Sequence, residues 1–147
     1  MNMRKLLLLT FACLGLGACA TLGNPNMDWI PIGPDFPPTK VKDVENIGGR
    51  EDVSRPYGVL GLLRIKNLKP DRQTLLMGVE KGRKIAASKG ADAIQFGQYN
   101  SAEDGAREPR VTLFIYAIKY VDNLTEEEEK IIEDFEVLGI LNERSNS

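Results

Sequence analysis

Few residues in this chain could carry covalent chemistry. Its 147 residues include two cysteines, Cys13 and Cys19, and no histidine. The missing histidine excludes a Ser-His-Asp triad and a Cys/His zinc site. Because both cysteines fall in the first twenty residues, the rest of the chain has neither a thiol nucleophile nor an internal disulfide.

The acidic residues form no recognisable catalytic or metal-binding pattern. Glu103, Asp104 and Glu108 gather beside Arg107 and Arg110. Paired carboxylates can serve as a general acid and base or bind Ca²⁺, but the spacing of an EF-hand and the pattern of a glycosidase pocket are absent. We interpret this stretch as a solvated hairpin loop, and we expect no enzymatic activity and no metal.

Phosphate and nucleic-acid binding are also disfavoured. Gly82-Arg83-Lys84 lacks the second glycine and the Ser/Thr of a phosphate-binding loop. The pI is about 5.3, and the basic residues are spread thinly without interleaved aromatic residues. We therefore expect no nucleic-acid partner.

Cys19 follows a segment that is organised like a secretory signal. Basic Arg4 and Lys5 precede an apolar run, Leu6–Leu16, and small residues follow it. The run is roughly a dozen residues long, whereas a spanning helix needs about 20. The segment predicts export, with residues 1–18 as the signal peptide and no permanent transmembrane helix.

Leu16-Gly17-Ala18-Cys19 resembles the lipobox of bacterial lipoproteins. The resemblance implies cleavage between Ala18 and Cys19 and a covalent lipid on Cys19. We expect no other cofactor. With each buried methylene contributing about 0.8 kcal/mol, two or more acyl chains would hold the protein on a bilayer. Ala20 is not the aspartate that resembles an inner-membrane retention signal, so the family rule favours the outer membrane, facing the periplasm, in a Gram-negative cell.

Two other interpretations of the residues around Cys19 remain open. Ala18-Cys19-Ala20 also fits an A-x-A cleavage site, which would release a soluble protein after Ala20. Cys19 could also be an incidental apolar residue of the signal.

Residues 19–39 are rich in proline, with five of the eight prolines of the chain. Pro31, Pro34 and Pro37 recur every third residue, which is the period of polyproline II and predicts a semi-rigid spacer. A Pro-x-x-Pro ligand motif is an alternative. Trp29 is unusual in a spacer: we expect it to dock on the following domain, or to lie at the bilayer interface.

The pattern of residues 40–121 predicts a globular domain. Asp71 is a candidate N-cap and Gly90 a candidate C-cap of a helix between two strands. Strand 110–121 is apolar on both faces, which predicts a central strand covered on both sides. The elements we expect are an edge strand at 41–47, a buried strand at 57–67, helix Asp71–Lys89, and strands at 91–99 and 110–121.

Gly78, Gly82 and Ala86 form a stripe of small residues along the predicted helix. Each internal glycine costs about 1 kcal/mol of helix propensity, so close packing should offset it. Packing on the sheet is the first interpretation, and contact with a partner helix is the second. Together with Trp29, these residues are the candidate interaction surface.

The pattern of residues 122–147 predicts an acidic helix. Thr125 and Glu128 form a capping box, and Gly139 can end the helix. Residues 121–147 carry 2 basic and 9 acidic groups, whereas residues 40–120 carry 15 and 10. We expect the helix to pack on the sheet face that bears Phe114 and Tyr116, or to bind a basic partner. Its apolar stripe is Ile131, Ile132, Phe135 and Leu138.

The expected fold is a small α+β domain of two to three layers. It has a mixed sheet of three or four strands, a βαββ core with a right-handed crossover, and an added C-terminal helix. Residues 55–61 and 89–94 resemble the small domains of YbjQ-like proteins and of Rcs-type stress-sensor lipoproteins. The stress sensor's domain is disulfide-bonded, and this chain has no cysteine there.

The sequence therefore predicts a lipid-anchored protein of the bacterial cell envelope. We expect a non-catalytic interaction or structural module whose partners are the bilayer and an envelope protein. A small-ligand-binding or stress-sensing domain is the alternative.

Overall fold

The structure is a computed structural model that describes residues 26–48, 53–101 and 108–145, and the side chains of residues 26–48, 53–100 and 108–135. Its elements are β1 (Met27–Pro31), the 3-10 turn η1 (Val41–Asp43), β2 (Glu45–Gly48), β3 (Tyr57–Leu68), α2 (Arg72–Ser88), β4 (Ala93–Ser101), β5 (Arg110–Tyr120), the 3-10 turn η2 (Val121–Asn123) and α3 (Glu126–Ser145). The signal segment, Cys19 and residues 103–107 of the acidic loop lie outside the described residues.

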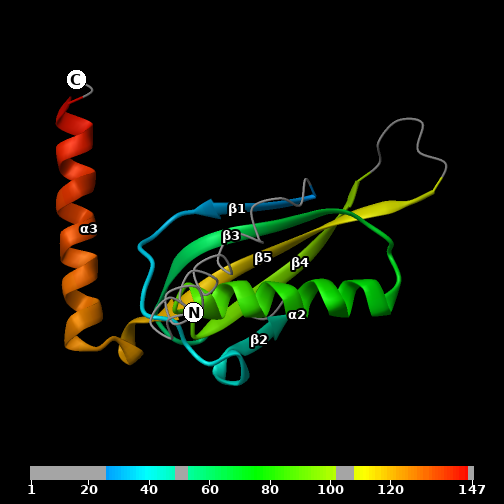
Figure 1. Cartoon of the computed structure of the whole chain (residues 1–147), viewed down its shortest axis with the longest axis horizontal. Helices are drawn as coiled ribbons and strands as arrows, with labels where there is room; N and C mark the ends of the chain where they lie inside the picture. Colours follow the sequence, from blue (N-terminus) through cyan, green and yellow to red (C-terminus); the bar gives the residue numbers. More distant parts are fainter. Residues whose placement is uncertain (1–25, 49–52, 102–107, 146–147) are drawn as a thin grey trace, which may run out of the picture.

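The strands form one mixed sheet in the order β1-β3-β5-β4-β2 (Figure 1). β5 pairs antiparallel with both β3 and β4, β1 pairs antiparallel with β3, and β2 pairs parallel with β4. The α+β class, the central position of strand 110–121 and the antiparallel pairing of the last two strands are confirmed. The sheet has five strands rather than three or four because residues at the N-terminal side add β1.

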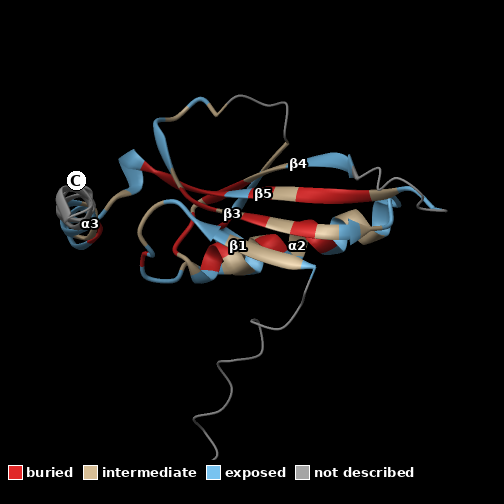
Figure 2. Cartoon of the chain, turned by 90° about the horizontal axis from the view of Figure 1, so that it is seen from above, coloured by how far each residue is buried: buried red, intermediate tan, exposed pale blue. Residues whose placement is uncertain are grey.

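Helix α2 covers one face of the sheet (Figure 2). Asp71 caps its N-terminus by accepting a hydrogen bond from the Thr74 backbone N–H at 2.8 Å. Gly90 follows the helix with φ +81°, a conformation that glycine adopts without strain. The predicted boundaries are thus confirmed. The core beneath the helix includes Leu63, Ile65, Leu113 and Ile115 from the sheet, with Val79 and Ala86 from α2.

The described part of the predicted spacer, residues 26–39, belongs to the domain. β1 pairs with β3 in the register Met27↔Ile65 and Trp29↔Leu63. Phe36 is buried against Gly90. The spacer prediction is therefore wrong for this part, because backbone pairing and apolar contacts with distant strands outweigh the local polyproline preference. The edge strand predicted at 41–47 is present as β2, preceded by η1.

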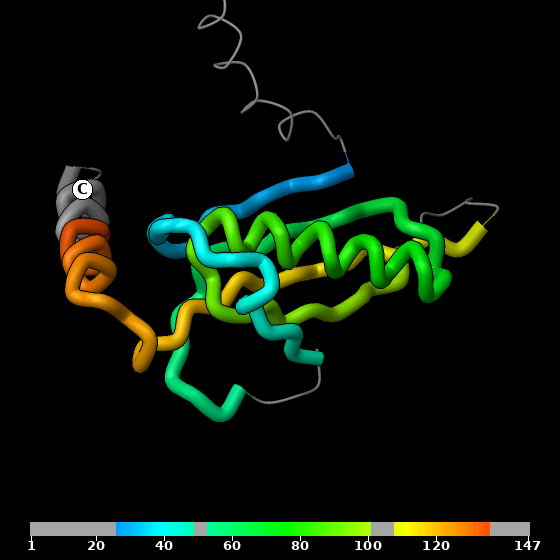
Figure 3. The backbone as a smooth tube through the Cα atoms, turned by 60° about the horizontal axis from the view of Figure 1, so that its bottom comes forward, coloured from blue at the N-terminus to red at the C-terminus, as the bar shows by residue number. Residues whose placement is uncertain are grey.

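Helix α3 stands beside the sheet instead of covering its second face (Figures 1 and 3). Tyr116, where we expected it to pack, is 39% exposed. The cause is η2, which directs the chain away from the end of β5. Arg55 holds this turn, because its guanidinium donates to Asp122 Oδ1 at 2.6 Å and to Asn123 Oδ1 at 3.0 Å. The helix also continues through Gly139, where we expected it to end.

Candidate functional site: a groove between α2 and β4

The groove exists because β2 is much shorter than β4. β2 pairs with Ala93–Phe96 and ends at Gly48. No described strand pairs with the outer edge of the remaining part of β4, Gly97–Ser101. Helix α2 has 17 residues, about 25 Å at 1.5 Å per residue, and it extends alongside this unpaired part. Between helix and strand lies the space that a longer β2 would fill.

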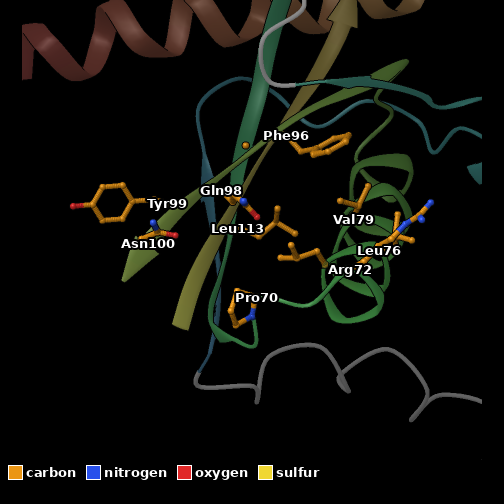
Figure 4. Close-up of a pocket in the computed structure, with 11 residues that line it drawn as sticks. Pro70, Arg72, Leu76, Val79, Phe96, Gln98, Tyr99, Asn100 and Leu113 are labelled. Atoms are coloured by element: carbon orange, nitrogen blue, oxygen red, sulfur yellow. The ribbon is translucent and has the colours of Figure 1, made fainter. Parts of the chain in front are cut away.

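The groove has a volume of about 1000 Å³. In Figure 4, Phe96, Gln98 and Leu113 from the sheet and Val79 from the helix flank one hollow, while Tyr99 points to the other side of β4. The described lining consists of Pro70, Arg72, Leu75, Leu76, Val79, Phe96, Gly97, Gln98, Tyr99, Asn100 and Leu113.

The groove walls expose apolar surface. Leu76, on the helix side of the groove, is 57% exposed. An exposed apolar surface of this kind, with a few polar groups at its rim, is typical of binding sites. Among the described lining residues only Arg72 carries a charge, and it has no ion-pair partner in the described part of the chain.

Apart from the groove, a polar cluster lies where β5 meets the start of α3. The buried Lys119 ammonium donates to Glu128 Oε1 at 2.7 Å and lies 3.5 Å from Asp92 Oδ1. Burial raises the pKa of Glu128, but the bonds from Lys119 and from the Thr125 backbone outweigh it, so this pKa lies below its ordinary value. The Thr125–Glu128 capping box is confirmed. Each charge here is paired, so the cluster fixes the start of α3.

Tyr120 extends this polar region to the opposite face of the sheet. Its hydroxyl donates to Glu45 Oε2 at 2.9 Å, and the Arg55 guanidinium carbon lies 3.9 Å from its ring centre. Burial, followed by the bond to the Glu45 carboxylate, raises the pKa of Tyr120 to about 12. The hydroxyl therefore stays protonated at neutral pH and works as a hydrogen-bond donor.

The glycine stripe is not an interaction surface. Gly78, Gly82 and Ala86 are buried against the sheet. A Cβ atom at Gly78 would lie 2.9 Å from Leu113 Cδ2, and one at Gly82 would overlap the Ile115 side chain. The first interpretation, close packing on the sheet, is confirmed, and contact with a partner helix is wrong.

Trp29 is likewise a packing residue. Its ring is half-buried against the core, and a Cβ atom at Gly61 would overlap it. The Lys89 ammonium lies 5.8 Å from the ring centre. The expected docking on the domain is confirmed. The remaining predicted site residues, Ala18 and Cys19, lie outside the described residues.

Sequence reasoning missed the groove. Its lining comes from α2, β4 and β5, and the space between them depends on where β2 ends, which has no local signature. One signal was present: Leu76 and Met77 are adjacent apolar residues on the helix, so they cannot both lie within one narrow buried stripe. Met77 is 66% exposed.

Two further properties concern the described residues only. They contain no group of three or more His, Cys, Asp or Glu side chains arranged to hold a metal ion. They also contain no helix with the length and apolar character needed to cross a membrane.

Comparisons with known proteins give one structural likeness. No family model matches the chain, and no curated protein matches it. The structure is similar to the crystal structure of a Francisella virulence factor, FvfA, with a TM-score of 0.48 and 19% sequence identity. The similarity covers 62% of this chain and 94% of that one.

Proposed function

We propose that this protein is a lipid-anchored module of the bacterial cell envelope that binds another envelope protein through the α2–β4 groove without catalysing a reaction. The acyl anchor is on Cys19, and the outer membrane facing the periplasm is the proposed location. The resemblance of Leu16-Gly17-Ala18-Cys19 to a lipobox supports the anchor. The resemblance to YbjQ-like and Rcs-type domains is consistent with a small non-enzymatic domain.

The groove is the observation that carries the binding function. It combines exposed apolar surface, a strand edge that no described strand pairs with, and the charge of Arg72, which has no ion-pair partner among the described residues. In a protein without a partner, such a surface would lower solubility, because exposed apolar strand edges favour aggregation. The polar clusters at Lys119 and Tyr120 support the non-catalytic part of the proposal, since their groups are paired with one another.

The anchor is tested with paired cysteine substitutions. Cells that express the protein, Cys13→Ser or Cys19→Ser are grown with radiolabelled palmitate and fractionated. We expect label in the membrane fraction for the unaltered protein and for Cys13→Ser, and no label for Cys19→Ser. Ala20→Asp should move the labelled protein from the outer to the inner membrane. Unlabelled wild-type protein in the soluble fraction would refute the anchor.

The binding site is tested with two neighbouring apolar residues of α2. Leu76 lines the groove and Met77 does not, although both are more than half exposed. Crosslinking in cells followed by mass spectrometry should recover a specific envelope protein with wild type and with Met77→Asp. Leu76→Asp should lose it. Equal recovery with the two variants would place the partner elsewhere on the molecule.

A small-molecule ligand is the second candidate. The groove volume of about 1000 Å³ lies at the upper end of ordinary ligand pockets, and Gln98 and Asn100 supply polar groups at its wall. Native mass spectrometry of protein purified from membranes distinguishes the two: a stoichiometric small ligand that Leu76→Asp removes would favour this candidate over a protein partner.

A further inference from the structure

We propose that the groove takes an extended, acidic peptide segment of the partner, which adds to the free edge of β4 as a sixth strand in line with β2. This inference rests on the proposed function of the groove and names the way in which the partner binds. The argument has three steps: the backbone groups at the edge, the side chains beside them, and the charge.

The first step is the direction of the backbone groups of β4. The Glu45 N–H of β2 donates to the Asp92 carbonyl at 3.0 Å, and Glu45 pairs in register with Ala93. In a strand, the N–H and C=O groups of successive residues point to opposite edges. From Ala93 onward, even-numbered residues therefore direct these groups away from β5. Beyond the end of β2, those of Gln98 and Asn100 point to an edge with no described strand.

The second step is the place of the side chains. An added strand beside Gly97–Ser101 would direct alternate side chains towards α2, where Leu75, Leu76 and Val79 form the apolar wall. Leu76, now 57% exposed, would be covered. When a peptide adds to a sheet edge as a strand, main-chain hydrogen bonds supply the affinity and pockets for alternate side chains supply the specificity. The established pairing of β2 with Ala93–Phe96 shows that this edge already accepts a parallel strand.

The third step is charge. Arg72, in the first turn of α2, is the one charged residue of the described lining and has no described ion-pair partner. A carboxylate on the incoming segment would supply the missing partner, and the same N-terminal turn of a helix favours negative charge. A second copy of this chain is less suited as occupant, because five edge residues offer little area compared with a stable dimer interface.

The inference is tested with full-length protein in detergent micelles and a random library of twelve-residue peptides displayed on phage. We expect enrichment of peptides that alternate apolar residues and carry an acidic residue. Gln98→Pro removes an N–H that points outward, so it should leave the β4–β5 ladder intact. It should weaken binding of an enriched peptide at least tenfold, whereas Gln98→Ala, which keeps the N–H, should change it less than threefold.

Two measurements keep the test independent of how Gln98→Pro folds. In wild-type protein, the peptide should slow hydrogen exchange of the Gln98 and Asn100 amides at least tenfold. Arg72→Glu should weaken acidic peptides at least tenfold and shift the selection towards basic ones. Peptides that Leu76→Asp displaces, but that neither protect these amides nor respond to Gln98→Pro, would overturn the added strand and leave the proposed function standing.

Two other outcomes would overturn the inference. If no enriched peptide responds to Leu76→Asp, both the added strand and the partner-binding groove are wrong. If the peptide-free protein sediments as a dimer that Gln98→Pro converts to a monomer, the edge is occupied by a second copy and not by a partner's segment.

Discussion

Lys119 and Glu128 are joined by a charge-assisted bond of 2.7 Å, although both side chains are less than one-tenth exposed. Removing two charges from water is costly, and the partners that each charged group has here offset part of that cost. Glu128 also accepts the Thr125 N–H at 2.9 Å, and Lys119 lies within 3.5 Å of Asp92. One carboxylate therefore closes both the capping box of α3 and the ion pair to β5.

Glu128→Gln should destabilise the protein at neutral pH by about 2 kcal/mol, because it replaces a charge-assisted bond by a neutral one. The folded-state pKa of Glu128 lies below 4.5. Its contribution is therefore complete above about pH 4.5 and is lost as the pH falls through the folded pKa. Urea unfolding followed by circular dichroism should show wild type and variant converging in acid. A constant difference from pH 7 to pH 3 would contradict this account.

Gly82→Ala should destabilise the protein, although alanine is the better helix former by about 1 kcal/mol. The added methyl group would overlap Ile115, and overpacking of a core typically costs about 1–3 kcal/mol. Adding Ile115→Val should restore part of the loss. Lys81→Ala, at the exposed neighbouring position, should stay within about 0.5 kcal/mol. Thermal and urea unfolding of the three variants and of the wild type measure these differences. A stabilised Gly82→Ala would mean that the helix lies farther from the sheet.

At the scale of the elements, those with local signals were predictable. The cap at Asp71, the stop at Gly90 and the capping box at Thr125 each depend on residues within one helical turn. The proline-rich segment was not, because β1 exists only through its pairing with β3, which lies thirty or more residues away in the sequence. The groove was not predictable for the same reason, since it depends on β2 ending at Gly48 beside a longer β4.

The place of β1 in the domain is tested by two substitutions in the same segment. Trp29→Ala should cost about 2 kcal/mol or more, because the ring packs on the core and over Gly61. Ile32→Ala, at a position 52% exposed, should cost less than about 0.5 kcal/mol. Free energies of unfolding from urea titrations decide between them. Two neutral substitutions would instead indicate that residues 26–39 form a spacer.

At the scale of the whole molecule, the two helices have different relations to the sheet. Helix α2 covers one face, while α3 stands beside the sheet and leaves Tyr116 exposed (Figure 1). The described contacts of α3 with the domain lie in its first turns, at Glu128, Ile131 and Ile132. Asp122 and Glu128 pair with Arg55 and Lys119 of the domain, whereas the other acidic residues with described side chains are exposed and have no described ion-pair partner: Glu126, Glu127, Glu129, Glu133 and Asp134. A projecting acidic helix suits a basic partner better than internal docking.

This arrangement sets where the chain can be shortened. A chain that ends after Phe135 keeps Glu128 and the first turns of α3, and its melting temperature should fall by less than about 3 °C. A chain that ends after Leu124 loses the partner of Lys119 together with Ile131 and Ile132. We expect this shorter chain to lose about 3 kcal/mol of stability, which corresponds to a fall of roughly 10 °C in the melting temperature of a domain of this size. Differential scanning calorimetry of both chains measures the contrast. If both shortened chains melt alike, the buried ion pair does not link α3 to the domain. If the longer one melts as low as we expect for the shorter, residues beyond Phe135 stabilise the sheet.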